Sequence, residues 1–283
     1  MPVSDPLKAL MDRFPEPDAN GTYVNLDREK IEAMQAVVAD LCKGGRESVL
    51  GLIDMLAEPG KGDDIKPHFA FHLLAVHVTG LGDEKTRADF ARAVASQIGS
   101  DRPKGVRKYL VQELQWAGGR EVAAALGRAL LDPDLCDDAA RALAAIGDGA
   151  ADEFLAALSK VRGPSRLSVI KKLAVLRCRK AAEAFRKALG DADADVRIAG
   201  AWGLARIADA SAVDALLAAA DGAREHWERI NTTDACLALA DGLQAAGRKA
   251  EAVRIWTHLR QTRTEHADAH VREAAQRALE AAT

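Results

Sequence analysis

The chain has 283 residues, of which 48% are hydrophobic and 29% are charged, while aromatic residues make up only 4%. Its net charge of -3 argues against a generic nucleic-acid-binding domain, which is usually strongly basic. Alanine and leucine dominate the apolar positions, which favours close packing of helices and leaves little material for an aromatic-lined pocket.

The four cysteines, Cys42, Cys136, Cys178 and Cys236, lie far apart in the sequence. Each is embedded among aliphatic residues on an expected helix, so we expect buried free thiols. Free thiols are typical of a reducing compartment, and no apolar run approaches the roughly 20 residues of a transmembrane helix. The sequence therefore predicts a cytoplasmic protein without a membrane partner.

The first 26 residues differ in composition from the rest of the chain. Residues 1–26 carry four prolines and the turn signal Asn20-Gly21, which favours an irregular arm ahead of the first long helix. Phe14 and Tyr23 are expected to anchor this arm. After it, helical periodicity is nearly continuous and no stretch alternates apolar and polar residues, so we expect a single helical solenoid over residues 27–283.

Short clusters of Gly, Asp and Pro interrupt the helical pattern about every thirty residues. The clearest unit begins at Asp191, where acidic residues cap a helix and small or apolar residues recur every three or four positions. Its second helix is expected over 212–220, and another copy of its first helix runs over 132–148. The expected ends of successive first helices are Gly82, Gly118, Gly147, Cys178, Ala208 and Gly247. Such thin helix pairs are stable only against their neighbours, so we expect a stack.

The unit that begins at Asp191 resembles a known repeat. Its Asp-x-Asp-x-Asp-Val-Arg start and its Leu-Ala-Arg-Ile-Ala-Asp finish are similar to the short HEAT-like repeat of phycobilisome lyases and of many bacterial proteins. The resemblance is most regular over residues 132–222. It implies an all-α fold, an α-solenoid of antiparallel helix pairs with a right-handed superhelix.

The C-terminal part departs from this pattern. Residues 234–283 resemble a tetratricopeptide repeat, because the run from Leu237 to Gly247 is followed by Glu251-Ala-Val and Trp256. Either resemblance gives an antiparallel helix pair that continues the stack. Asn231-Thr-Thr-Asp is expected to end one helix, which holds Trp227, and to cap the next.

No arrangement of residues in the sequence is typical of an enzyme. Gly60-Lys61 is followed by Gly62 in place of serine or threonine, so a phosphate-binding loop is not indicated. Some HEAT-like proteins are di-iron hydroxylases that use His-Glu dipeptides as ligands, and none of the seven histidines here is followed by glutamate. We therefore expect no catalytic residue and no cofactor.

One group of residues has the spacing of metal ligands. Asp64, His68 and His72 are four residues apart and would share one side of a helix. The alternative is a capping Asp64, an exposed His68 and a packed His72. Because complete metal sites are rare, we favour this alternative and expect no metal.

The strongest asymmetry of the sequence is a basic band over residues 160–187, with ten Lys and Arg against one acid and a net charge of +9. The rest of the chain therefore sums to -12. Such a band either attracts phosphate, nucleic acid or an acidic peptide, or it is a solvated face that balances nearby acids. The candidate partner-binding residues are Arg166, Lys171, Lys172, Arg179, Lys180, Arg186 and Lys187, together with Trp227 as an exposed aromatic.

The function that follows from this pattern is a non-enzymatic interaction scaffold. A solenoid exposes a long surface, so we expect a protein or peptide partner, with an acidic partner at the basic band. A bilin-lyase-like or other small-molecule transfer protein is the first alternative, and it requires a pocket. A nucleic-acid-binding HEAT-like protein is the second, and the overall acidity disfavours it.

Overall fold

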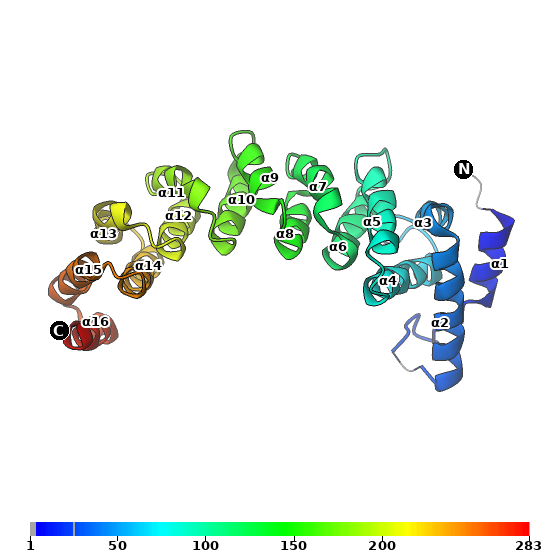
Figure 1. The fold of residues 1–283 in the computed structure, drawn as a ribbon, viewed down its shortest axis with the longest axis horizontal. Coiled ribbons are helices and arrows are strands. Elements are labelled where there is room, and N and C mark those ends of the chain that lie inside the picture. Colours follow the sequence, from blue (N-terminus) through cyan, green and yellow to red (C-terminus); the bar gives the residue numbers. More distant parts are fainter. Residues whose placement is uncertain (1–3, 25, 283) are drawn as a thin grey trace. The chain divides into compact units, whose positions relative to one another are not determined.

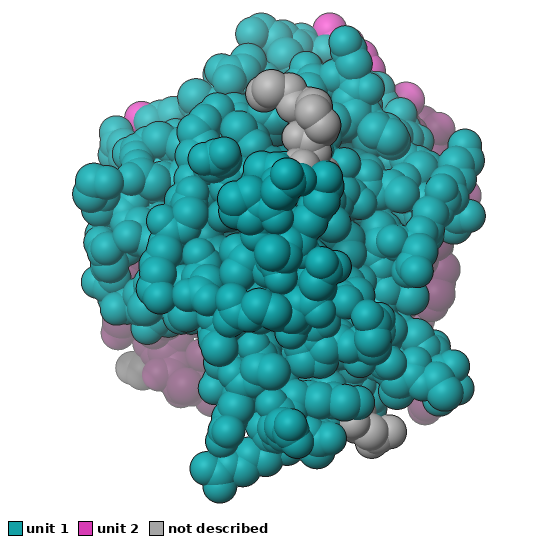
Figure 2. Space-filling model, turned by 90° about the vertical axis from the view of Figure 1, so that its right-hand side faces the viewer, with its two compact units in different colours: residues 1–160 teal, residues 161–283 magenta. Residues whose placement is uncertain are grey.

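A computed structural model describes residues 4–24 and 26–282 (Figure 1). Within these residues the chain is all-α, with sixteen α-helices, short 3-10 helices and no β-strand. They form two compact units, unit 1 over residues 1–160 and unit 2 over residues 161–283, coloured separately in Figure 2. None of the helices in this part of the chain is long and apolar enough to cross a membrane. The predicted all-α solenoid is confirmed, whereas its continuity across the boundary between the units stays a prediction.

Unit 1 stacks its helices in two layers. Its helices are α1 (Asp5–Arg13), α2 (Arg28–Lys43), α3 (Gly45–Asp54), α4 (Ile65–Gly80), α5 (Glu84–Ile98), α6 (Lys104–Ala117), α7 (Ala123–Ala129), α8 (Cys136–Ile146) and α9 (Ala150–Leu158). In one layer α2 packs on α4, α4 on α6 and α6 on α8. In the other, α3 packs on α5, α5 on α7 and α7 on α9, so consecutive helices alternate between layers.

Unit 2 is also built of helix pairs and ends in a single helix. Its helices are α10 (Gly163–Val175), α11 (Ala182–Ala188), α12 (Ala194–Arg206), α13 (Val213–Asp221), α14 (His226–Ala245), α15 (Lys249–Thr262) and α16 (Ala269–Ala282). Helix α12 lies between α10 and α14, while α13 contacts α14 and α15, and α16 packs on α15. Buried residues such as Leu216, Leu239 and Leu243 form a common core of the last helices.

The helix boundaries follow from local chemistry. Asp27, Asp83 and Asp193 each accept a hydrogen bond from a backbone N–H in the first turn of the helix that follows. Gly82 and Gly247 adopt positive φ just after α4 and α14, a conformation that favours glycine at a helix end. Each of the six predicted first-helix ends lies within three residues after an observed one, so the predicted repeat spacing is confirmed.

The N-terminal arm is more regular than its composition suggested. Residues 5–13 form α1, because Pro6 occupies the first turn, where its missing N–H costs no hydrogen bond. Leu7 and Met11 are buried on one side of this helix. The anchor at Phe14 and Tyr23 is confirmed, since Phe14 is buried and the two rings meet edge to face at 5.9 Å.

The prediction that residues 231–234 end a helix is wrong. Helix α14 runs through them without a break. Thr232 and Thr233 are buried, and the Thr232 hydroxyl donates to the carbonyl of Glu228, 2.8 Å away, one turn earlier in the same helix. A threonine that bonds back to its own helix satisfies its hydroxyl without capping anything.

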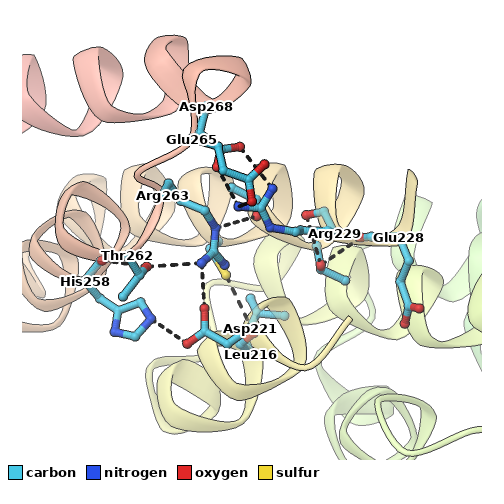
Figure 3. Close-up of polar contacts among 12 residues, drawn as sticks. Leu216, Asp221, Glu228, Arg229, His258, Thr262, Arg263, Glu265 and Asp268 are labelled. Atoms are coloured by element: carbon cyan, nitrogen blue, oxygen red, sulfur yellow. Dashed lines mark hydrogen bonds and ion pairs between the residues drawn. The ribbon is translucent and has the colours of Figure 1, made fainter. Parts of the chain in front are cut away.

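Buried arginines connect the last helices of unit 2 (Figure 3). Arg263 is only 3% exposed, and its Nη1 donates to Asp221 Oδ1 on α13 at 2.6 Å. Its Nε donates to the hydroxyl of Thr233 on α14 at 3.2 Å. Arg229 on α14 pairs with Asp268, just before α16, at 2.5 Å. These charge-assisted bonds cross-link the C-terminal helices.

Small residues let α11 and α12 approach closely, as the repeat pattern predicted. A Cβ atom at Gly200 would lie 2.7 Å from the carbonyl oxygen of Phe185. A Cβ atom at Gly203 would overlap the ring of the same phenylalanine, which is fully buried. The seam between these helices therefore has no room for a methyl group at either position.

We expect Gly203→Ala to lower the free energy of unfolding by about 1 to 3 kcal/mol, because overpacking exceeds the gain in helix propensity of up to about 1 kcal/mol. Gly80→Ala is the matched control, since a Cβ atom at Gly80 meets no atom within 4 Å. This control should be neutral or slightly stabilising. Urea unfolding followed by circular dichroism measures both, and equal effects of the two substitutions would contradict the close seam.

Candidate functional site

The cations of the basic band fall into paired and unpaired groups. From Arg162 onward they lie in unit 2, on or next to α10, α11 and the 3-10 helix η2 (Arg179–Ala181) between them. Three predicted partner-binding residues form ion pairs within the unit: Arg166 with Asp191, Arg186 with Asp209, and Lys187 with Glu183. In these pairs the positive charge is already compensated, so part of the band balances neighbouring acids.

The other predicted cations have different environments. The side chains of Lys171, Lys172 and Arg179 make no hydrogen bond or ion pair with the described residues, while Lys180 is exposed on η2. Arg166 belongs to the first turn of α10, and Arg179 follows its last turn. A helix of 13 residues is about 20 Å long, so these two arginines lie at opposite ends of it.

Trp227 is 44% exposed, as the sequence predicted. It lies in the first turn of α14, and its carbonyl accepts a hydrogen bond from the amide of Asn231. Gly242 is 15 residues further along the same helix, or about 22 Å. Trp227 is therefore far from the C-terminal end of α14, where the pocket described next is found.

Unit 2 contains a pocket of about 590 Å³ at the C-terminal ends of α10, α12 and α14. Side chains from three successive repeats meet there because the first helices of these repeats lie side by side. Its polar lining consists of three arginines, and its apolar lining combines a tryptophan with small residues. The main lining residues are Arg177, Arg179, Trp202, Ala205, Arg206, Ala208, Ala238 and Gly242.

The three arginines of this pocket are exposed, and their side chains have no hydrogen-bonding or ionic partner among the described residues. Each helix end contributes about half a negative charge, so three ends offset roughly half of the +3 that the arginines carry. A net charge of about +1.5 remains. Because guanidinium stays ionised and presents several donors, the arrangement can bind carboxylate or phosphate groups.

Trp202 provides an apolar surface beside these charges. It is half-buried and packs against the core of the last helices while it also lines the pocket. Alanine side chains of α12 and α14 line the rest. The pocket is thus suited to a ligand that combines anionic groups with an apolar part.

The backbone of the pocket is conformationally strained. Arg177 and Ala208 both line it, and among the described residues they alone combine a side chain with positive φ, at 49° and 50°. Gly247 is the equivalent residue after α14, with φ 76°, and in all three places the next N–H bonds to a carbonyl five residues back. A residue with a Cβ atom costs about 1 to 2 kcal/mol in this conformation, so glycine is the relaxed choice.

Arg177 belongs to the basic band but not to the predicted partner-binding residues, and Arg206 belongs to neither. The available signal was positional, because both arginines lie beside the predicted ends of first helices at Cys178 and Ala208. Charge counting alone gives no reason to prefer them over the paired Arg186.

The structure separates the predicted metal-like group into two pairs. His68 Nδ1 lies 2.8 Å from Asp64, and His72 Nδ1 lies 3.0 Å from Glu113, which comes from another helix. Both histidines are half-buried, so the expected contrast between an exposed His68 and a packed His72 is not seen. Within residues 4–24 and 26–282, no group of three or more His, Cys, Asp or Glu side chains is arranged to hold a metal ion.

No protein-family profile and no curated protein matches the chain. Among solved structures, a designed armadillo repeat protein is 18% identical, with a TM-score of 0.32, covering 98% of this chain and 100% of that one. Two engineered proteins from the Northeast Structural Genomics Consortium are 17% and 20% identical, with TM-scores of 0.47 and 0.28. The match to the 17% identical protein covers 98% of this chain and 89% of that one. The match to the 20% identical protein covers 99% of this chain and 97% of that one. The helical-repeat architecture is established by the helix pairs themselves.

Arg177→Gly should raise the free energy of unfolding by about 1 kcal/mol, because it relieves the left-handed backbone and removes no bond. Gly247→Arg is the reciprocal control, since its φ is 76° and its Cβ position is open. It should destabilise by a similar amount. Urea unfolding measures both, and a loss of stability in Arg177→Gly would show that this arginine has a structural role.

Proposed function

We propose that the chain is a non-enzymatic, HEAT-like interaction scaffold that binds an acidic segment of a protein partner in the arginine-lined pocket of unit 2. The observation that carries this proposal is the convergence of three unpaired arginines on one cavity, one of them on a strained backbone. Paired arginines elsewhere in the unit have a structural explanation, and these three do not.

The chemistry of the pocket favours a peptide with carboxylates beside an apolar residue. Guanidinium groups bind carboxylates through two parallel hydrogen bonds, and the Trp202 ring offers an apolar contact next to them. A volume of about 590 Å³ exceeds the needs of a single carboxylate and accommodates neighbouring side chains. Residues 161–283 carry 20 Lys and Arg against 16 Asp and Glu, a net charge of +4 that attracts an acidic segment.

The same lining supports binding over catalysis. The residues that line the pocket are arginine, tryptophan, isoleucine, alanine and glycine, which supply neither a nucleophile nor a general base. For the cellular location we propose the cytoplasm. All four cysteines are free, three of them buried and Cys42 half-buried where the sequence predicted burial, and free thiols suit a reducing compartment.

A labelled acidic peptide tests the proposal directly. We expect fluorescein-labelled Glu-Asp-Leu-Glu-Asp to bind with an affinity that falls as salt is added, because the attraction is ionic. The affinity for this peptide should fall at least tenfold in a triple variant that combines Arg177→Gln, Arg179→Gln and Arg206→Gln. Lys171→Gln with Lys172→Gln is the control, since these cations are unpaired but lie outside the pocket. This control should change the affinity less than threefold in fluorescence anisotropy.

Each other outcome overturns a specific part of the proposal. If the lysine control loses as much affinity as the arginine variant, the band acts through its overall field and the pocket is not the site. If the arginine variant binds the peptide as tightly as the parent, the unpaired arginines have no role in recognition. If a single-stranded oligonucleotide of equal charge binds more tightly than the peptide, the ligand class is nucleic acid.

A further inference from the structure

Unit 1 contains a second pocket, of about 420 Å³, with the opposite chemistry. It lies between the loop at residues 21–23, the N-terminal half of α4 and α6. Its walls are aromatic, contrary to the expectation from composition, and its polar groups are carboxylates and imidazoles without any lysine or arginine. The lining residues that matter are Tyr23, Phe69, Tyr109, His68, His72 and Glu113, with Asp64 beside them.

The aromatic walls are held in place by contacts with one another and with residues outside the pocket. Tyr23 stacks on Phe69 with ring centroids 4.3 Å apart and planes 12° from parallel. The buried Phe14 ring meets Tyr23 edge to face, and the Tyr23 hydroxyl donates to the carbonyl of Pro15 at 2.9 Å. Tyr109 lies across the His68 ring and donates to a backbone carbonyl at 2.7 Å. The rings are therefore preorganised, which lowers the entropic cost of binding a ligand.

The carboxylates orient both histidines. Glu113 is 5% exposed, and burial raises the pKa of its carboxyl group, an effect that the neighbouring His72 opposes. Nδ1 of His72 lies within 3.1 Å of both Glu113 oxygens, and Nδ1 of His68 lies 2.8 Å from Asp64 Oδ2. A neutral imidazole that donates from Nδ1 presents Nε2 as an acceptor. In this tautomer both rings offer an acceptor beside a carboxyl group.

The electrostatic surroundings are acidic as well. Since the whole chain carries -3 and residues 161–283 carry +4, residues 1–160 sum to -7. Burial raises the pKa of Tyr23, and the charges of Glu16 and of the exposed Asp63 raise it further. Asp63 precedes Asp64, which lines the pocket. The nearby Lys66 is compensated, because its ammonium lies 2.7 Å from Glu16. The local field therefore favours a cation.

We infer that this pocket binds an organic cation with N–H donors, a primary ammonium or a guanidinium group, whose alkyl chain lies against the aromatic lining. Ring faces attract cations, the carboxylates supply charge complementarity, and the Nε2 acceptors require hydrogen atoms on the ligand. The volume suits one lysine or arginine side chain or a small free amine. This inference concerns unit 1 and is independent of the function proposed for unit 2.

Calorimetric titrations at pH 8, where imidazole is mostly neutral, test this inference with four probes. N-acetyl-lysine methylamide and N-acetyl-arginine methylamide represent a partner side chain, and cadaverine represents a free amine. N-acetyl-norleucine methylamide is the uncharged control and should bind at least tenfold more weakly than the lysine probe. Tighter binding of cadaverine than of both amino-acid probes would identify a free amine as the source of the cation.

Two variants and two controls locate the binding. Tyr23→Ala should weaken binding of the lysine probe about five- to tenfold, and Glu113→Gln at least tenfold. Trp116→Ala is a control, because this exposed ring contacts His72 but does not line the pocket. The triple arginine variant of unit 2 is the other control, and both should bind like the parent. Circular dichroism verifies that each variant is folded.

Should Glu113→Gln fail to fold, Asp63→Asn removes an exposed acid whose charge acts on Tyr23, and it should still weaken binding of the lysine probe about two- to threefold. Equal binding of the lysine and norleucine probes would overturn the inference, as would parental affinity in both Tyr23→Ala and Glu113→Gln. A trimethylated lysine probe that binds as tightly as lysine would overturn the requirement for N–H donors.

Discussion

The close seam between neighbouring helix pairs is the constraint on which the rest of this structure depends. A pair of helices is too thin to bury its own apolar face, so each repeat is stable only against the next. At α11 and α12 the seam is so tight that Gly200 and Gly203 leave no space for a methyl group beside Phe185. Because the seam fixes the spacing of the first helices, it also fixes where their ends lie, and the pocket of unit 2 is formed by those ends.

The residues packed in the seam differ from those just after the first helices, which can be exchanged without changing the core. After α4, α8, α10, α12 and α14, a residue within two positions of the helix end has positive φ, a conformation for which glycine is the relaxed choice. Gly118 after α6 is different, with φ -74°. Gly247 follows that preference, whereas Arg177 does not and gives up roughly 1 to 2 kcal/mol. A repeat can thus gain a charged group at its end without any change to the packed core. That independence makes a solenoid a versatile carrier of binding sites.

The sequence predicted features that depend on neighbours along the chain, and it missed those that depend on distant partners. Caps, glycine ends and three- to four-residue periodicity are local, so the first-helix ends were placed within three residues. The break expected at residues 231–234 failed because two buried threonines bond within the helix, and burial is a tertiary property. Glu113 was missed as the partner of His72 because 41 residues separate them. Whether an arginine is paired or free depends on similarly distant carboxylates.

Whether a charged side chain already has an ionic partner therefore matters more for ligand binding than the number of charges in a segment. The basic band contains ten cations, but Arg166 and Arg186 lie against Asp191 and Asp209, and an external anion would have to displace those carboxylates. Arg206 lies outside the band and has no such competitor, so it contributes more to the pocket than its place in the sequence suggests. The same criterion separates the acidic pocket of unit 1 from the acids around it, because no lysine or arginine among the described residues lines it and its carboxylates contact imidazoles. We therefore expect binding sites on this scaffold where uncompensated charge lies against a preorganised aromatic surface, and only secondarily where a segment has a high net charge.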